Sequence, residues 1–149
     1  MSDKPRILIA DDNQANVELL EAYLAEIDCE IAIAADGQET IEQVAEFQPD
    51  VLLLDVMMPK LSGFEVCRQL KEDPQTSKIM ILMVTALNEF GDIERAVDVG
   101  TDDFLSKPVQ KFELLKRVEN MIRLKDVTDE VERLQLYIRN MEDAEGPAN

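Results

Sequence analysis

Five short apolar stretches recur along the chain, and each gives way to polar residues. The stretches at residues 7–10 and 51–54 are continuously apolar, which is typical of strands that are buried on both faces of a parallel sheet. Residues 30–34 alternate as a half-buried strand does. The pattern therefore predicts strands over the following ranges: 6–10, 30–34, 51–55, 78–85 and 103–106.

Apolar residues fall at helical spacing between these strands, most clearly over residues 16–27. Later helices are predicted to end near Pro49, Pro74 and Gly100, because the residue before proline avoids the helical conformation and glycine favours the position after a helix. Strand and helix thus alternate five times. This predicts an α/β fold, a (βα)5 doubly wound parallel sheet with helices on both faces and right-handed crossovers.

The segment after residue 108 departs from this alternation. A helix that begins near Val109 has no evident stop before about Asp143, so we expect one extended C-terminal helix, far longer than the average of about 11–12 residues. Apolar residues in its second part are spaced alternately three and four apart, which is a heptad seam. The seam residues are Leu124, Val127, Val131, Leu134, Ile138 and Met141.

Two interpretations of this seam stay open. With β-branched residues at the a positions, it favours a parallel two-stranded coiled coil and hence a homodimer. Alternatively, a single amphipathic helix packs on its own domain. We expect a folded domain over residues 5–124, a helical extension over 125–142 and a disordered tail over 143–149, which contains Gly146 and Pro147.

Composition narrows the choice of partners and compartment. The chain has 149 residues, with 32 acidic and 15 basic side chains and a formal net charge of −17, which argues against direct binding of nucleic acid or of an anionic membrane. Two distant cysteines, Cys29 and Cys67, define no disulfide framework. No signal peptide or run of about 20 apolar residues is evident, so we expect a cytoplasmic protein. The sequence has no histidine, so carboxylates, a hydroxyl or a lysine must carry any chemistry.

Polar residues whose side chains could bind a ligand or react lie where the predicted strands end. They are Asp11 and Asp12, Asp55, Thr85 and Lys107. Because the carboxyl ends of parallel strands share one edge of the sheet, where α/β proteins bind ligands, these residues should meet. Two carboxylates about 4 Å apart repel by roughly 4 kcal/mol at an effective dielectric of about 20, so three of them call for a cation. Oxygen ligands suit Mg²⁺ or Mn²⁺, and the whole set suits phosphoryl transfer to a carboxylate.

Taken in order, these motifs resemble the signature of the receiver domain of bacterial two-component response regulators. The resemblance rests on Asp11-Asp12, residues 55–59 (Asp-Val-Met-Met-Pro), Thr85-Ala86 and Lys107-Pro108, and it covers residues 5 to about 124. The stretches 11–17 and 63–67 are most similar to receivers that precede diguanylate cyclase domains. The family implies a flavodoxin-like fold with strand order 2-1-3-4-5.

The resemblance implies that Asp55 accepts a phosphoryl group from a histidine kinase or a phosphotransfer protein, and that the domain then signals to a downstream protein effector. Asp12 and Asp55 would bind Mg²⁺ directly, helped by the backbone carbonyl of Met57, and Asp11 would act partly through water. Such a domain is a signalling switch rather than primarily an enzyme.

Further roles follow from the same resemblance. Thr85, Lys107 and the amide of Ala86 would contact the phosphoryl oxygens. Phe104 would be the switch aromatic that turns inward as Thr85 moves, and the bond before Pro108 would be cis. Met57 and Leu87 occupy the positions that flank the path of hydrolytic water. Since both are apolar, we expect slow autodephosphorylation.

Each motif alone has a plainer interpretation, such as a helix cap for Asp11 and Asp12, a solvated charge for Lys107 or a core position for Phe104. A phosphatase of the haloacid dehalogenase type would need a second aspartate where Met57 stands. A flavodoxin-like FMN carrier would need a phosphate-binding loop where residues 11–13 are acidic. A receiver that only binds proteins, without phosphorylation, is a further alternative, as is a regulatory fragment of a diguanylate cyclase.

Overall fold

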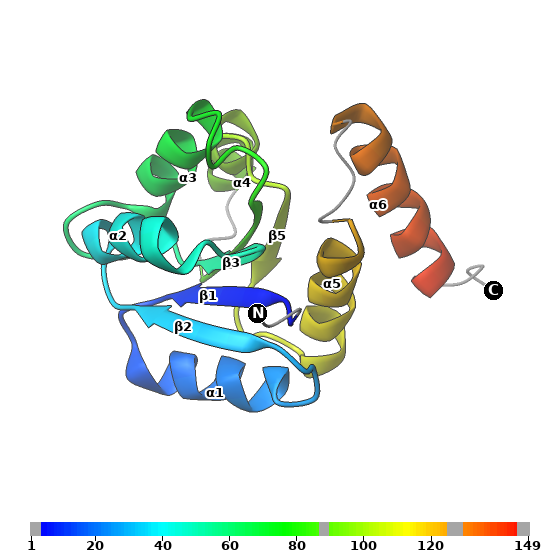
Figure 1. The fold of residues 1–149 in the computed structure, drawn as a ribbon, viewed down its shortest axis with the longest axis horizontal. Coiled ribbons are helices and arrows are strands. Elements are labelled where there is room, and N and C mark those ends of the chain that lie inside the picture. The colour runs from blue at the N-terminus through cyan, green and yellow to red at the C-terminus, as the bar shows by residue number, and fades with distance from the viewer. Residues whose placement is uncertain (1–3, 87–89, 125–129, 146–149) are drawn as a thin grey trace.

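The computed structural model describes residues 4–86, 90–124 and 130–145 (Figure 1). Strands and helices alternate as predicted. The strands are β1 (Arg6–Ala10), β2 (Glu30–Ala34), β3 (Val51–Leu54), β4 (Met80–Thr85) and β5 (Asp103–Ser106). The helices are α1 (Gln14–Leu24), α2 (Gly37–Phe47), α3 (Gly63–Glu72), α4 (Phe90–Asp98), α5 (Lys111–Arg123) and α6 (Glu130–Glu145).

All five strands are parallel and lie in the order β2-β1-β3-β4-β5, which confirms the predicted fold. In the centre of the sheet Ile9 pairs with Leu53, and Leu53 pairs with Leu82. β3 is the middle strand, so whatever follows Leu54 is flanked by the ends of β1 and β4. This topology puts Asp55 between the residues that end the neighbouring strands.

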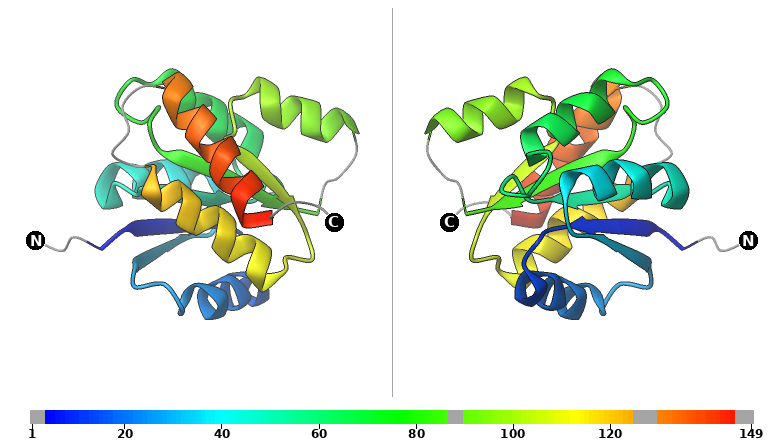
Figure 2. Two further views of the ribbon diagram at one scale, coloured as in Figure 1. Left: turned by 90° about the vertical axis from the view of Figure 1, so that its right-hand side faces the viewer. Right: turned by 90° about the vertical axis from the view of Figure 1, so that its left-hand side faces the viewer.

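Helices cover both faces of the sheet (Figures 1 and 2). Ile7 and Ile9 of β1 belong to the core under α1 and α5, whereas Leu8 and Ala10 belong to the core under α2 and α3. Because successive side chains of a strand point to opposite faces, a strand with both faces covered must be apolar throughout. This is why the predicted runs were continuous rather than alternating.

Local signals set most helix boundaries. The side chains of Asn13, Asp36 and Ser62 each accept a hydrogen bond from the backbone N–H three residues on, which caps α1, α2 and α3. Gly63 must lack a side chain, since a Cβ there would lie 2.3 Å from the backbone oxygen of Asp55. The first turn of α3 therefore approaches the loop that carries Asp55. Gly100 has a φ of 93° just beyond α4, in keeping with its predicted place after a helix.

The prediction of one continuous C-terminal helix is wrong. α5 ends at Arg123, and the separate helix α6 begins at Glu130 and packs back beside α5 (Figure 2). Leu124, assigned to the seam, is buried in the core beneath α5, and its N–H bonds to the carbonyl of Met121 in a tightened last turn. Leu124, the first residue of the predicted seam, is therefore part of the domain core and is not available to a coiled coil.

The contacts of α6 follow the other interpretation of the seam, a helix packed on its own domain. Among residues 134–141, whose side chains the structure describes, Tyr137 is the buried one, and it lies outside the seam. Leu134 and Ile138 are 58% and 50% exposed, and Met141 is half-buried against the core. Val127 and the side chain of Val131 lie outside what the structure describes.

Smaller boundaries also differ from the prediction, among them the end of β3 at Leu54 and the start of α5 at Lys111. β4 begins at Met80 rather than at residue 78, because Met80 is the first residue that pairs with β3. α1 starts directly after its cap, Asn13, and ends at Leu24. α6 continues to Glu145, through residues 143–145 that were expected to be disordered, and the rest of that tail lies outside the described residues.

Candidate functional site

Three carboxylates meet at the carboxyl edge of the sheet. Asp11 and Asp12 follow β1, and Asp55 follows β3. Each offers an oxygen within 4.8 Å of the others. Asp11 and Asp55 are only 3% and 6% exposed, whereas Asp12 faces solvent. The structure thus brings together the acids that were predicted to meet, and it leaves one side of the group open.

Backbone hydrogen bonds hold two of these acids in line with the strands. The N–H of Asp11 donates to the carbonyl of Ala34 at 3.1 Å, and the N–H of Asp55 donates to the carbonyl of Ala10 at 2.9 Å. Both residues therefore continue the sheet's ladder by one step, although they stand just past the strands. Their side chains are fixed by the ladder rather than by a loose loop.

One oxygen of each buried carboxylate is used within its own loop. Oδ1 of Asp11 accepts from the N–H of Asn13 at 2.9 Å, and Oδ1 of Asp55 accepts from the N–H of Met57 at 3.2 Å. These bonds orient both carboxylates in the same manner. Their second oxygens, Oδ2, turn toward a common cation.

That cation is Lys107, just beyond β5. Its Nζ donates to Oδ2 of Asp11 at 2.9 Å and to Oδ2 of Asp55 at 3.0 Å. Burial by itself disfavours the ammonium, but the hydrogen bonds and charges of the two acids outweigh it, so the pKa of Lys107 is raised above its ordinary value. With three carboxylates against one ammonium, the group keeps an excess of negative charge.

The remaining predicted residues lie around this group. Thr85 ends β4 with a buried side chain, and its carbonyl accepts the N–H of Lys107 at 2.9 Å. Ala86 follows at the surface. Phe104 is half-buried against the core beneath α2 and α3. The bond between Lys107 and Pro108 is cis, as expected.

The two positions predicted to flank hydrolytic water have different outcomes. Met57 is 62% exposed beside Asp55, and Leu87 lies outside the described residues. Sequence reasoning missed the close approach of Gly63 to the Asp55 loop, although its place at a predicted helix start was a signal. It also missed that Lys107 binds Asp11 and Asp55 together.

A five-stranded parallel sheet of this order, with acids, a hydroxyl and a lysine at its carboxyl edge, defines the receiver domain class. The chain belongs to the response regulator receiver domain family, which matches residues 7–119. The resemblance seen in the motifs is thereby confirmed. Phosphotransfer signalling is the function of this family.

Particular relatives support this assignment. The chain is 43% identical over 136 residues to the response regulator PleD of Caulobacter vibrioides, a match that covers 91% of the chain and 30% of PleD. It is 39% identical over 122 residues to the DNA-binding dual master transcriptional regulator RpaA of Synechocystis, covering 82% of the chain and 51% of RpaA. The chain therefore spans only part of the length of these relatives.

A solved structure agrees with the fold. The signal receiver domain of a signal transduction histidine kinase from Syntrophus aciditrophicus superposes with a TM-score of 0.78 at 28% identity, covering 85% of the chain and 96% of that domain. Within the described ranges, no helix combines the length and apolar character needed to cross a bilayer.

Proposed function

We propose that Asp55 is the phosphoacceptor of a Mg²⁺-dependent signalling switch. The observation that carries this proposal is that the Lys107 ammonium lies between Asp55 and Asp11. Asp12 lies on the solvent-exposed side of the same group. Asp55 follows the middle strand, so the metal-binding acids flank it on one side and Thr85 on the other. Asp55 is thus the carboxylate of the group that lies between the acids after β1 and Thr85 at the end of β4.

The donor set fits a hard divalent cation. Oxygens of Asp11, Asp12 and Asp55 lie close together and carry more negative charge than Lys107 neutralises, and Mg²⁺ or Mn²⁺ prefers such ligands. The carbonyl of Met57 is a further proposed ligand. When bound, the ion would supply neutralisation of charge on the transferring phosphoryl oxygens.

In the proposed reaction, a carboxylate oxygen of Asp55 attacks the phosphorus of a phosphohistidine on a histidine kinase or phosphotransfer protein. The oxygen–phosphorus bond forms as the phosphorus–nitrogen bond breaks, and the imidazole that leaves takes up a proton. Lys107, the Thr85 hydroxyl and the Ala86 amide would hold the phosphoryl oxygens. The product is a 4-aspartylphosphate.

Slow hydrolysis of this acyl phosphate is part of the proposal. The exposed side chain of Met57 stands beside the acceptor, and its thioether is only a weak hydrogen-bond acceptor that cannot deprotonate water. The domain would thus store the signal rather than turn over substrate, which is the behaviour of a switch and not of an enzyme. Turning of Phe104 with Thr85 is the proposed conformational response.

The output of the switch is proposed to be a protein contact. Leu134 and Ile138 lie four residues apart on α6 and are 58% and 50% exposed, so the homodimer interpretation of the seam is kept for these two residues. A monomeric mass in solution, both with and without a phosphoryl mimic, would exclude it. Control of a further domain, with a diguanylate cyclase among the alternatives, is supported by the chain's 30% coverage of PleD.

Intact mass spectrometry after incubation with acetyl phosphate and Mg²⁺ tests the proposed function. The wild-type chain should gain one phosphoryl group, and the gain should vanish with EDTA. Asp55→Asn should gain nothing. An unmodified wild-type chain would instead favour the alternative of a protein-interaction module that is not phosphorylated.

A further inference from the structure

A small set of polar contacts holds α6 on the domain. The Tyr137 hydroxyl donates to Oδ2 of Asp103, and the Arg117 guanidinium lies 3.3 Å from the same oxygen. The Asn120 side chain donates to the carbonyl of Tyr137 at 3.2 Å and accepts from the Asn140 side chain at 2.8 Å. We call these five residues the α6 latch. Burial, and then the charge of Asp103, raise the pKa of Tyr137, so its hydroxyl stays a donor.

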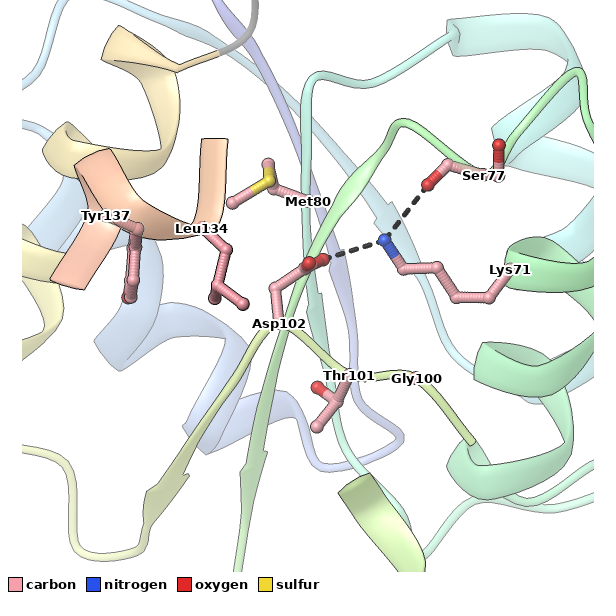
Figure 3. Close-up of a pocket in the computed structure, with 8 residues that line it drawn as sticks. All are labelled: Lys71, Ser77, Met80, Gly100, Thr101, Asp102, Leu134 and Tyr137. Carbon is pink, nitrogen blue, oxygen red and sulfur yellow. Dashed lines mark hydrogen bonds and ion pairs between the residues drawn. The ribbon is translucent and has the colours of Figure 1, made fainter. Parts of the chain in front are cut away.

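The packing around this latch is incomplete. A cavity of about 410 Å³ lies where α6 faces the amino-terminal ends of β4 and β5. Figure 3 shows Leu134 and Tyr137 on one side of it, with Met80, Asp102 and Lys71 opposite. Because this cavity is open to solvent and Leu134 beside it stays 58% exposed, α6 buries less apolar surface by docking than a closely packed helix would.

The polar contacts of the latch are also incomplete. Nε of Arg117 is buried and has no hydrogen-bond partner among the described residues, and a buried donor without a partner raises the free energy of the docked arrangement. Docking also leaves Leu134 and Ile138 largely exposed. The docked position of α6 therefore depends on the bonds of the latch together with the apolar packing of Tyr137, Leu136 and Met141.

The acid of the latch belongs to the strand that leads to the phosphoacceptor site. Asp103 begins β5, and its Oδ1 accepts from the N–H of Phe104 at 2.8 Å. Lys107, directly after β5, binds both Asp11 and Asp55. Among the strands that the structure describes, β5 lies at the edge of the sheet and pairs with β4 alone. A four-residue strand, supported by a neighbour on one side only, thus joins the two clusters.

We propose that α6 is a reversible latch, released when a phosphoryl group on Asp55 shifts β5 through Lys107. This inference rests on the proposed function. A phosphoryl group on Asp55 would draw the Lys107 ammonium away from its two carboxylates, and Lys107 would carry the end of β5 with it. The Tyr137 hydroxyl of α6 and the Arg117 guanidinium of α5 both contact the Asp103 carboxylate of β5, so a displacement of β5 breaks contacts there. Coupling between two sites is reciprocal, so loosening the latch must favour the phosphorylated form by the same factor.

Hydrogen exchange of the full chain tests this coupling. Peptides that cover α5 and α6 are followed with and without beryllium trifluoride and Mg²⁺, a stable mimic of the phosphoryl group. In wild type the mimic should speed exchange across α6. Tyr137→Phe, which removes one hydrogen bond to a charged acceptor, should speed exchange about tenfold without the mimic. Asn140→Ala should act in the same direction, and Gln135→Ala, at an exposed position of α6, should not.

The affinity for beryllium trifluoride supplies the reciprocal measurement. It should be higher in Tyr137→Phe than in wild type, because a weakened latch raises the share of the released form that the mimic favours, and it should not change in Gln135→Ala. If Asp55 gains a phosphoryl group but α6 exchange and the mimic's affinity stay unchanged, or if the mimic slows exchange, the latch proposal is overturned and the proposed function stands. If Asp55 gains no phosphoryl group, both are overturned.

Discussion

Two clusters in this molecule both combine carboxylates with a cation, but one is suited to binding a ligand and the other to holding a helix in place. At the carboxyl edge of the sheet, Asp55 and Asp11 share the Lys107 ammonium, and Asp12 stands beside them in solvent. At the opposite end of β5, Asp103 meets Arg117 and Tyr137. Each contains a cation beside at least one carboxylate that is buried or half-buried. They differ in charge balance and in access to solvent.

That difference separates a binding site from a structural contact. The edge cluster has more carboxylates than cations, so a cation that binds there reduces the repulsion between them. Because Asp12 is exposed, such a cation can reach the cluster from solvent. The α6 latch pairs one carboxylate with one guanidinium and a neutral hydroxyl, and α6 covers it. A buried acid is therefore no sign of function by itself. An excess of acid that is open to solvent is the informative feature.

The largest expected effect comes from removing the cation of the edge cluster. Lys107→Ala should slow phosphorylation by acetyl phosphate about 100-fold to 1000-fold, because a fixed charge near the transferring oxygens is lost. The rate of mass gain measures this. Lys111→Ala, a few residues on at the exposed start of α5, is the matched control and should react at the wild-type rate. Equal rates in both variants would remove Lys107 from the mechanism.

A smaller effect is expected from the acid of the balanced cluster. Asp103→Asn leaves Arg117 without its counter-charge, which should lower the free energy of unfolding by about 2 kcal/mol. This is less than the 3–5 kcal/mol of a fully buried pair, since both side chains keep some exposure. Urea unfolding gives the value. Asp98→Asn, at an exposed position of α4, should change little, and similar losses in both variants would contradict a role for the pair.

In the edge cluster the same type of substitution should act with the opposite sign. Asp12→Asn removes part of the excess charge, so the metal-free chain should melt at a slightly higher temperature. Its affinity for Mg²⁺ should fall about tenfold or more, because a ligand is lost. Thermal unfolding across a Mg²⁺ titration measures both, since a bound ligand stabilises the folded state. A Mg²⁺ response identical to that of wild type would place the ion elsewhere.

The smallest expected effect is the alkaline response of the α6 latch. The pKa of Tyr137 is raised above its ordinary value of 10.0, so above that pH the unfolded chain loses a proton that the folded chain keeps. Stability should then fall as pH rises. Below about pH 10, the difference in unfolding free energy between wild type and Tyr137→Phe should be constant, and above it the wild-type advantage should shrink. A difference that is flat across this range would show that Tyr137 ionises freely.

Sequence patterns predicted the sheet well because a strand that is buried on both faces appears in the sequence as a continuous apolar run. Only a continuously apolar run such as Val51–Leu54 can fill a strand covered by helices on both sides. Parallel pairing then requires Asp11 and Asp55 to share an edge. The central group of the site was therefore predictable from the order of the strands alone.

The C-terminal region was not predictable in the same way. Helical spacing places Leu124 and Leu134 on the apolar face of a predicted helix, but it does not show which surface each residue packs against. Leu124 packs into the core, and Tyr137 of α6, which lies outside the seam, is buried. The bond between Tyr137 and Asp103 joins residues far apart in sequence, and no local pattern marks such a pair.

Chemical trapping of the modified residue tests the central claim most directly. Borohydride reduces an acyl phosphate on aspartate to homoserine, which peptide mass spectrometry locates in the chain. After treatment with acetyl phosphate and Mg²⁺, homoserine should appear at position 55 and at neither 11 nor 12. Homoserine at either of those positions, or at none of the three in a chain that has gained a phosphoryl group, would contradict the assignment of Asp55 as the phosphoacceptor.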